Sequence, residues 1–466
     1  MNPRPIDQTS GKLSTTTKVL YGIGQLTDSI SANIFIFFFV FFLTDIAGVN
    51  PAIAGLVSLI AMVWDGITDP IIGYCSDNIK WKSGRRRPLV LMAAVPIGIA
   101  LWLMFTTVEF QGTAKSIYYI AVAMFFYTSY TCYYIPYMAL GAEMTDDYDE
   151  RTSVRFHCLA FQLLGVFAAS SGTMIVVEKL TAITGSVQTA WSVTAAFFGL
   201  LSSTAALIAW NYTRGKEPVI KRRDNTLFLP TLMEVVKIKS IRTLAASVLI
   251  YAMGFSITMG ILVFLMNNNM QLNGNQQVVF WTFLSAMGLA IVPICNGLGV
   301  KMGKRKAYIQ LITLVGVAQF LFTFIDFSFA LLMVFGAIVA FGHNTYFGLF
   351  QAMMYDCCEA YEYKTGLRRE GAITSIIFLF QKIGFALGMW MMGVVMDLTG
   401  YIGGVPQQTE GALGGIKMLT TVYAPACYIL SACLMITYKL DGKAFDSLKS
   451  ALKKNNRETG DFMDIF

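Results

Sequence analysis

The sequence has little charge. Only 14% of its 466 residues are Asp, Glu, Lys or Arg, whereas a soluble chain carries about a quarter. Hydrophobic residues make up 55% instead. This composition excludes secreted, fibrous, disordered and nucleic-acid-binding proteins. It predicts one polytopic membrane unit with no nucleic-acid partner, although the length alone suits about three soluble domains.

Metal ligands and catalytic sets are also scarce. His157 and His343 are the only histidines, and the eight cysteines show neither zinc-site spacing nor a disulfide framework. The sequence contains no visible Ser/His/Asp set and no Gly-rich phosphate loop. We therefore expect a protein that is not an enzyme and has no cofactor or metal beyond a coupling ion.

A cleavable signal peptide is missing too. Residues 1–17 are polar, and the first apolar stretch, from Val19 to Leu43, is too long for a signal-peptide core. We expect this stretch to be the first span of a multi-pass protein of the plasma membrane, the inner membrane of a bacterium.

Long apolar stretches dominate the chain. A membrane-spanning helix needs about 20 such residues. We expect an all-α membrane protein with twelve transmembrane helices and both termini in the cytoplasm. The expected spans are residues 19–44, 52–76, 88–108, 116–143, 156–177, 189–211, 243–267, 277–300, 307–325, 327–355, 372–397 and 417–438.

Lys and Arg favour one side of these spans. The connections that follow the odd-numbered spans carry only three basic residues, Lys115, Lys179 and Lys417. Those on the other side carry many more, including Arg85–Arg87 and Lys304–Lys306. Because basic loops stay in the cytoplasm, this asymmetry predicts cytoplasmic termini and an even number of spans.

A long polar connection divides the chain near its middle, and a short repeated motif indicates two related halves. A Gly followed by three cations occurs at Gly84–Arg87 and again at Gly303–Lys306. We expect two six-helix bundles, as in the major facilitator fold. The expected parts are residues 1–211 (first bundle and N-terminal tail), 212–242 (cytoplasmic linker), 243–438 (second bundle) and 439–466 (cytoplasmic tail).

Two acids in the second span are candidates for an ion site. Placing a charged side chain at mid-bilayer costs at least about 2.5 kcal/mol, so a charged residue there usually has a function. Asp65 and Asp69 lie one helical turn apart on one face, with Thr68 beside them. With Thr131 from the fourth span, they offer oxygen ligands for Na⁺ or an acceptor for H⁺. The alternative is structural pairing with a cation on another helix.

Lys382 in the eleventh span is the expected partner of these acids. It lies about ten residues into that span, near mid-depth at about 1.5 Å per residue. The lysine and a bound ion would compete for the same carboxylates, which would link ion occupancy to conformation. Snorkelling of the lysine to the membrane surface does not suit this depth.

Other polar and aromatic residues are candidates for binding a sugar, because rings stack on sugars and hydroxyls bond to them. Such aromatic stripes also serve ordinary packing. For Asp28, helix pairing and substrate binding fit equally well. The candidates are Asp28, Ser29, Trp64, Tyr130, Tyr134, His157, Asn344 and Trp390.

These motifs resemble the glycoside–pentoside–hexuronide:cation symporter family of the major facilitator superfamily over nearly the whole chain. The resemblance implies a cation site at Asp65 and Asp69, with Thr68 and Thr131 as further ligands, and a coupling role for Lys382. The segments that carry it are Tyr21–Gly24, Leu43–Gly48, Asp65–Pro70, Gly84–Pro88, Ile135–Pro136, Gly141–Thr145, Tyr361–Gly366, Arg369–Gly371 and Gln381–Lys382.

The sequence departs from the melibiose-transporting members of that family at the substrate positions. Where their acids on spans one and four bind galactosyl hydroxyls, this chain has Ser29 and Tyr134, and Asp28 is turned by about 100° around the helix. The span-five arginine is missing, with His157 near its place. A galactoside is therefore not expected, whereas an acidic sugar such as a hexuronide is permitted.

We expect a monomeric secondary active transporter that carries a glycoside, pentoside or hexuronide with Na⁺ or H⁺ by alternating access. Its partners would be a small sugar or sugar acid and the lipid bilayer. One alternative keeps the fold but carries an amphipathic solute such as a lysolipid or a drug. Another is a sugar sensor, which is disfavoured because residues 439–466 form only a short polar tail.

Overall fold

All regular structure in the computed structural model is helical within the part of the chain that it describes. Eleven of its helices are long and apolar enough to cross a membrane. The expected all-helical membrane architecture is therefore confirmed. The described residues are 13–78, 86–145, 148–214, 234–235, 237–365, 370–405, 407–442, 444–445 and 447–448.

Two compact units divide the chain. The division passes through α2 (Gln25–Phe41) and α3 (Pro51–Asn78), so the segment between Ile36 and Gly66 belongs to the second unit. Most of the expected linker at 212–242 lies outside the described residues, and the expected domain boundaries stay a prediction. The first unit comprises Met1–Phe35 and Ile67–Arg223, and the second comprises Ile36–Gly66 and Asp224–Phe466.

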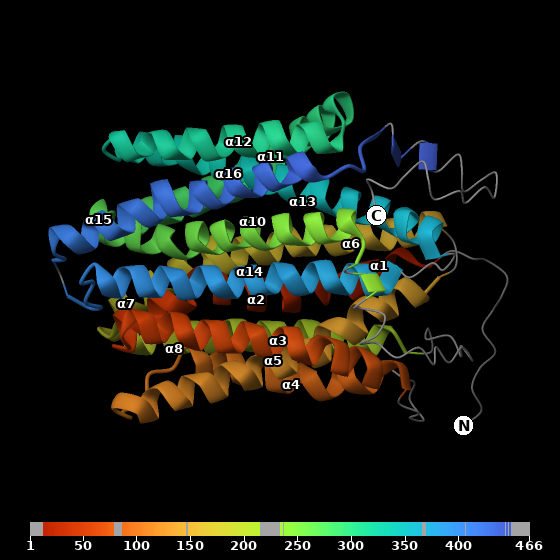
Figure 1. Ribbon diagram of the computed structural model, residues 1–466. Coiled ribbons are helices and arrows are strands. Elements are labelled where there is room, and N and C mark those ends of the chain that lie inside the picture. The colour runs from red at the N-terminus through yellow and green to blue at the C-terminus, as the bar shows by residue number, and fades with distance from the viewer. Residues whose placement is uncertain are drawn as a thin grey trace, which may run out of the picture. The chain divides into compact units, whose positions relative to one another are not determined.

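The first unit consists of helices from the N-terminal half of the chain. Here α4 packs against α5 and α8, and α1 packs against α6 and α8 (Figure 1). A π-helical turn at Ala168–Gly172 joins α6 to α7 in one span. Besides its parts of α2 and α3, the unit contains α1 (Thr15–Ile23), α4 (Arg87–Met104), α5 (Gly112–Glu143), α6 (Tyr148–Phe167), α7 (Thr173–Thr184) and α8 (Val187–Tyr212).

The second unit holds the remaining helices. Figure 1 shows α10 beside α14 and α16, while α13 packs against α11 and α12. A π-helical turn at Leu419–Tyr423 joins α15 to α16 in one span. The helices are α10 (Lys239–Phe264), α11 (Gly274–Met302), α12 (Lys304–Leu321), α13 (Phe329–Thr365), α14 (Glu370–Leu398), α15 (Glu410–Met418) and α16 (Ala424–Leu434).

The expected fourth span lies on α5, which is not one of the eleven apolar helices. With 32 residues it is long enough to cross a bilayer. Its Tyr, Thr and Ser residues, such as Tyr130 and Thr131, make it less apolar than the other spans. These same residues contact Asp28 and Asp69, as described below.

Local sequence determines where several helices begin and end. Asn273 begins α11 with a capping box. The Asn273 side chain accepts the Gln276 backbone N–H, and the Gln276 side chain accepts the Asn273 backbone N–H. Ser186 caps α8 by accepting the Thr189 amide N–H at 3.2 Å. Gly303, with φ of 82°, separates α11 from α12 in a conformation that favours glycine.

Small residues let helices in each unit approach closely, as is common in membrane proteins. A Cβ atom at Gly384 or Gly388 of α14 would overlap the backbone oxygen of Leu249 or Met253 on α10. In the first unit, a Cβ atom at Gly98 of α4 would lie 2.5 Å from the backbone oxygen of Gly199 on α8.

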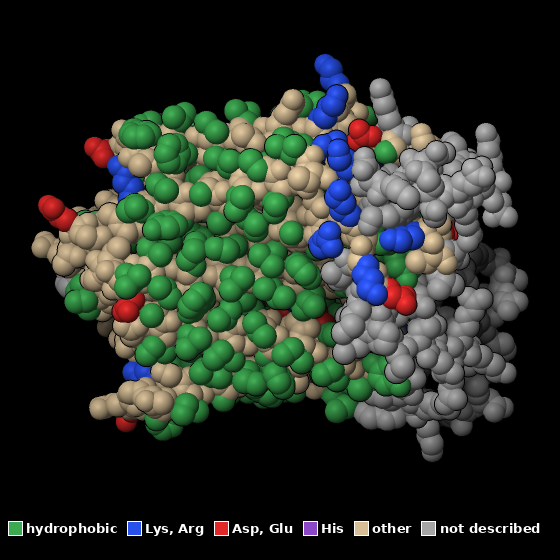
Figure 2. Space-filling model, viewed as in Figure 1, with side chains coloured by type: hydrophobic (Ala, Val, Ile, Leu, Met, Phe, Trp, Pro, Cys, Tyr) green, Lys and Arg blue, Asp and Glu red, His purple; other side chains and the backbone are tan. Residues whose placement is uncertain are grey.

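Lys and Arg gather at one end of the second unit. We call it the basic end; α11 and α13 finish there and α12 begins there. Figure 2 shows blue side chains at this end and a hydrophobic surface over the middle of the helices. At the opposite end, Lys417 lies 3.4 Å from Asp326. The basic end is defined by Lys301, Lys304, Arg305, Lys306 and Lys364.

Candidate functional site

Asp65 and Lys382 form an ion pair in the second unit. The Lys382 Nζ atom lies 2.6 Å from Asp65 Oδ2, and the Asp65 side chain is only 4% exposed. Glycines explain why the two helices come so close: a Cβ atom at Gly393 of α14 would overlap the Pro51 carbonyl oxygen at the start of α3. The lysine expected to face the span-two acids thus bonds to one of them.

Asp69, the second predicted ion-site acid on α3, has different partners, which lie in the first unit. The Thr131 hydroxyl, from α5, donates to Asp69 Oδ1 at 3.1 Å. The Thr68 and Thr131 hydroxyl oxygens are 3.4 Å apart. Thr68 and Thr131 are both buried, whereas Asp69 is half-buried. Three of the four expected ion ligands therefore contact one another directly.

The chemistry of α3 follows from these contacts. Asp65 and Asp69 are one turn apart on a single continuous helix, so they share a face. One carboxylate binds an ammonium group and the other accepts a hydroxyl hydrogen bond. A cation at Asp65 would have to displace Lys382 or share its carboxylate, whereas Asp69 already lies beside neutral oxygen donors suited to Na⁺.

A second polar cluster in the first unit surrounds Asp28. The Tyr130 hydroxyl donates to Asp28 Oδ1 at 2.5 Å, and Gln25 Nε2 donates to Oδ2 at 2.6 Å. The Tyr134 ring stacks on Tyr130, with ring centroids 5.5 Å apart. The structure therefore brings three of the predicted substrate residues together. Gln25 was missed, although its spacing three residues before Asp28 places it on the same helical face.

Two other predicted residues bond to the backbone of their own helices. The Ser29 hydroxyl donates to the Gln25 carbonyl oxygen at 2.6 Å. A Cβ atom at Gly165 of α6 would overlap the Ser29 hydroxyl oxygen. His157 Nδ1 lies 2.8 Å from the Ser153 carbonyl oxygen. These contacts give the two side chains structural partners. Their expected role at the substrate stays a prediction.

The remaining predicted residues lie in the second unit. Trp64 is half-buried, and Trp390 is 40% exposed. Asn344 on α13 donates both hydrogens of its amide group to backbone, at 3.0 Å to Gly288 and 2.9 Å to Ala340. Its amide is held in one orientation by these bonds.

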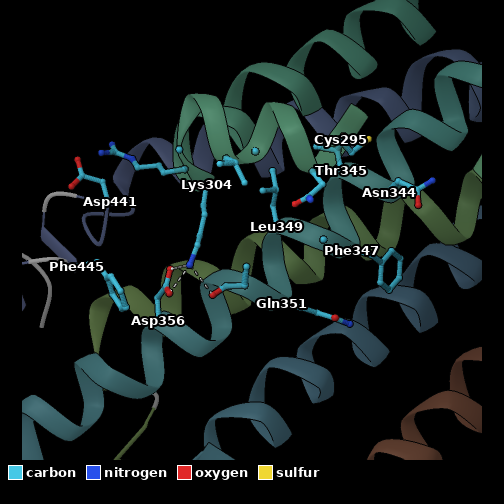
Figure 3. Close-up of a pocket in the computed structure, with 18 of the residues that line it drawn as sticks. Cys295, Lys304, Asn344, Thr345, Phe347, Leu349, Gln351, Asp356, Asp441 and Phe445 are labelled. Atoms are coloured by element: carbon cyan, nitrogen blue, oxygen red, sulfur yellow. Dashed lines mark hydrogen bonds and ion pairs between the residues drawn. The ribbon is translucent and has the colours of Figure 1, made fainter. Parts of the chain in front are cut away.

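Asn344 also lines a cavity of about 630 Å³ between α11 and α13 (Figure 3). The cavity runs toward the basic end, where Lys304 bonds to both carboxylate oxygens of Asp356 at 2.7 Å. No periodic pattern in the sequence predicts this cavity, because its walls come from α11, the start of α12, α13 and the segment after α16.

A further acid, the half-buried Asp45, was not predicted as a site. Tyr401 donates to Asp45 Oδ1 at 2.7 Å, and Asn268 donates to the Tyr401 hydroxyl at 3.2 Å. Burial raises the pKa of Tyr401, and the neighbouring Asp45 carboxylate raises it further. The tyrosine therefore stays protonated and acts as a donor.

The sequence pattern of the family described as "MFS/sugar transport protein" matches residues 20–442. The chain belongs to this family. It is 27% identical over 459 residues to a Bacillus subtilis protein described as the uncharacterised symporter YnaJ, covering 98% of each chain. It is 25% identical over 464 residues to an Escherichia coli protein described as a glucuronide carrier protein homolog, covering 94% of this chain and 95% of that one.

The fold also resembles a solved structure. The crystal structure of the nucleoside transporter NupG aligns with a TM-score of 0.65 at 12% identity, covering 91% of this chain and all of that one. At this identity the likeness concerns the fold alone. Together the comparisons confirm a multi-pass membrane transporter of the resembled superfamily, a class of proteins distinct from enzymes.

Proposed function

We propose that this protein is a secondary active transporter that imports a glycoside, pentoside or hexuronide together with Na⁺ or H⁺ by alternating access. The observation that carries the proposal is the ion pair of Asp65 with Lys382, one turn away from Asp69 and its Thr131 donor. Buried charges in a membrane helix are costly and therefore mark ion or substrate pathways.

The coupling ion is assigned to Asp65 and Asp69, with Thr68 and Thr131 as neutral ligands. Lys382 acts as the coupling residue because it holds Asp65 when no ion is bound. Ion binding then releases the lysine or changes its contacts, which alters the packing of α14 on α3. A ligand that favours one of two states shifts their populations by its differential affinity.

The solute is assigned to the Asp28 cluster. Tyr130, Tyr134 and Gln25 offer an aromatic face and hydrogen-bonding groups, the combination that sugar sites need. The Escherichia coli relative described as a glucuronide carrier homolog supports an acidic sugar. Ser29, Trp64, His157, Asn344 and Trp390 remain further candidates for contacts with the solute.

The proposed topology has twelve spans, with α5 as the fourth and both termini in the cytoplasm. The high charge density at the basic end of the second unit supports this orientation. We propose that the monomer works in the bacterial inner membrane.

A thermal-shift screen followed by transport tests the proposal. Sugars and uronates are added to the purified protein with and without Na⁺ at two pH values, because a bound ligand raises the melting temperature. Hits are then assayed for gradient-driven uptake into proteoliposomes. A sugar that stabilises the protein but is never accumulated would identify a sensor. Stabilisation by lysolipids and by no sugar would identify a carrier of amphipathic solutes.

A further inference from the structure

The cavity between α11 and α13 extends from the middle of α13 to its end. Asn344 and Asp356 both line it and lie on this helix. Their separation of twelve residues corresponds to about 18 Å along the helix axis. The cavity therefore follows α13 over a length comparable to half the hydrocarbon core of a bilayer, which is about 30 Å thick.

One face of α13 supplies polar groups along this length. Asn344, Gly348 and Gln351 follow each other at helical spacing and share that face. Because the Asn344 amide donates both hydrogens to backbone, its oxygen is left to accept a hydroxyl hydrogen. Gln351 is exposed and offers both a donor and an acceptor.

The cavity also has an apolar wall and a charged end. Phe347 packs against His343, with ring centroids 4.4 Å apart, and its ring borders the cavity near Asn344 (Figure 3). At the basic end, the Lys304 ammonium pairs with Asp356 and lies 5.5 Å from the Phe445 ring centroid. The Lys304 side chain is still 43% exposed. Arg305 also lines the cavity and bonds to the uncharged Met435 carbonyl oxygen, so it adds a second cation at this end.

Two glycines leave part of the cavity open. A Cβ atom placed at Gly348 would meet no other atom within 4 Å. The same is true of Gly303, at the basic end of the cavity. A volume of about 630 Å³ is within the range of small-molecule sites, about 300–1,000 Å³.

We infer that this cavity is a release subsite, where the transported solute binds through Asn344, Gln351 and Phe347 before it leaves the protein at the basic end. The inference rests on the proposed transport function and adds a second place of contact to it. The solute class is a polyhydroxylated ring that carries an acid group. Its hydroxyls bond to the two amides, its C–H face packs on Phe347, and its carboxylate is drawn to Lys304.

The residues after the last span belong to this subsite. Leu440, Asp441 and Phe445 line the cavity, and Leu448 is fully buried. Asp441 begins a short helical turn by accepting the Ala444 amide N–H at 3.0 Å. This part of the expected cytoplasmic tail therefore borders the cavity at the basic end.

The test compares one Gly→Leu variant that fills the cavity with a second Gly→Leu variant outside it. Gly348→Leu points a side chain into the empty space, whereas Gly297→Leu is the matched control. Gly297 lies on α11, also meets nothing within 4 Å and does not line the cavity. Gln351→Ala serves as a second variant, because an exposed side chain is rarely needed for folding.

Transport is measured in right-side-out and inside-out membrane vesicles with methyl β-D-glucuronide, and with methyl β-D-glucoside as the uncharged comparison. Gly348→Leu should raise the KM measured from the basic-end side by about tenfold, the value of one or two lost hydrogen bonds. The KM from the other side and both KM values of Gly297→Leu should stay within about twofold. Gln351→Ala should raise the same basic-end KM by about threefold.

The outcomes separate the inference from the proposed function. If the wild type transports the glucuronide and both KM values of Gly348→Leu and Gln351→Ala match those of Gly297→Leu, the release subsite is wrong and the transport function stands. Equal changes on both sides would also overturn the subsite. If the wild type carries neither probe in either vesicle type, the proposed function fails and the subsite fails with it.

Discussion

The Lys382 ammonium lies 2.6 Å from Asp65 Oδ2, so a lysine of α14 neutralises a carboxylate of α3 inside a membrane-spanning helix. Neither charge is well solvated, since the side chains are 21% and 4% exposed. Removing one partner of a buried pair leaves the other uncompensated, which is more costly than replacing both. This asymmetry makes the pair testable.

Lys382→Ala should lower the free energy of unfolding of the ion-free protein by about 3–5 kcal/mol, because it leaves the Asp65 carboxylate without a cation. The double variant Asp65→Asn/Lys382→Ala removes both charges and should recover most of that loss. Thermal unfolding in detergent measures both. If Lys382 competes with Na⁺ or H⁺, Lys382→Ala should also show a larger stabilisation by the ion than the wild type. A single variant as stable as the double one would argue against a pair of this kind.

Thr131→Ala should weaken the binding of the coupling ion by about tenfold, because it removes the hydroxyl that bonds to Asp69 Oδ1. The matched control is Thr128→Ala, one turn earlier on α5, where the hydroxyl donates to the Met124 carbonyl oxygen of its own helix. Ion-dependent thermal shifts over a range of concentrations give the two affinities. Equal affinities in both variants would remove Thr131 from the ion site.

Tyr130→Phe should raise the KM for the solute by at least about tenfold. It removes a hydrogen bond to a charged group, and such bonds contribute about 1.5–3 kcal/mol. Tyr134→Phe keeps the stacked ring next to it and should change the KM by less than about threefold. Initial uptake rates give both values. A larger effect at Tyr134 would place the solute against that hydroxyl instead.

Tyr401→Phe should destabilise the protein by about 1.5–3 kcal/mol, because its hydroxyl donates to the half-buried Asp45 carboxylate. The raised pKa of Tyr401 keeps the donor proton in place at neutral and mildly alkaline pH, so the loss should not depend on pH there. Tyr438→Phe is the control: it is also buried, and its hydroxyl lies 3.6 Å from the Cys357 sulfur. Thermal unfolding should rank the two variants in this order, and the reverse order would contradict the role of Asp45.

The helices could be predicted from the sequence because the bilayer imposes their length and composition. The apolar stretch from Val19 to Leu43 is part of a helical span that the structure gives as Thr15–Ile46. The expected pairing of Lys382 with a span-two acid followed from the cost of unpaired charge, which leaves few partners at that depth. Both predictions follow from the cost of placing polar residues and unpaired charges in the hydrocarbon core of the bilayer.

Contacts between helices were harder to predict, because they depend on which small residues face each other. The close approach of Gly393 to Pro51, which aligns Lys382 with Asp65, has no signal in either helix alone. The same holds for Ser29, whose hydroxyl bonds to the Gln25 carbonyl oxygen and faces Gly165. Hydropathy also does not predict the π-helical turns, such as Phe42–Ile46, which contains Asp45.

Ion-driven uptake by Asp65→Asn and Asp69→Asn tests the central claim most directly. Proteoliposomes with wild type or either variant receive an inward Na⁺ gradient at constant pH, and separately an inward H⁺ gradient without Na⁺, with labelled methyl β-D-glucuronide outside. The wild type should concentrate the sugar above its external level with one of the gradients, and both variants should only equilibrate it. Accumulation by either variant to the wild-type level would contradict the assignment of the coupling ion to these two carboxylates.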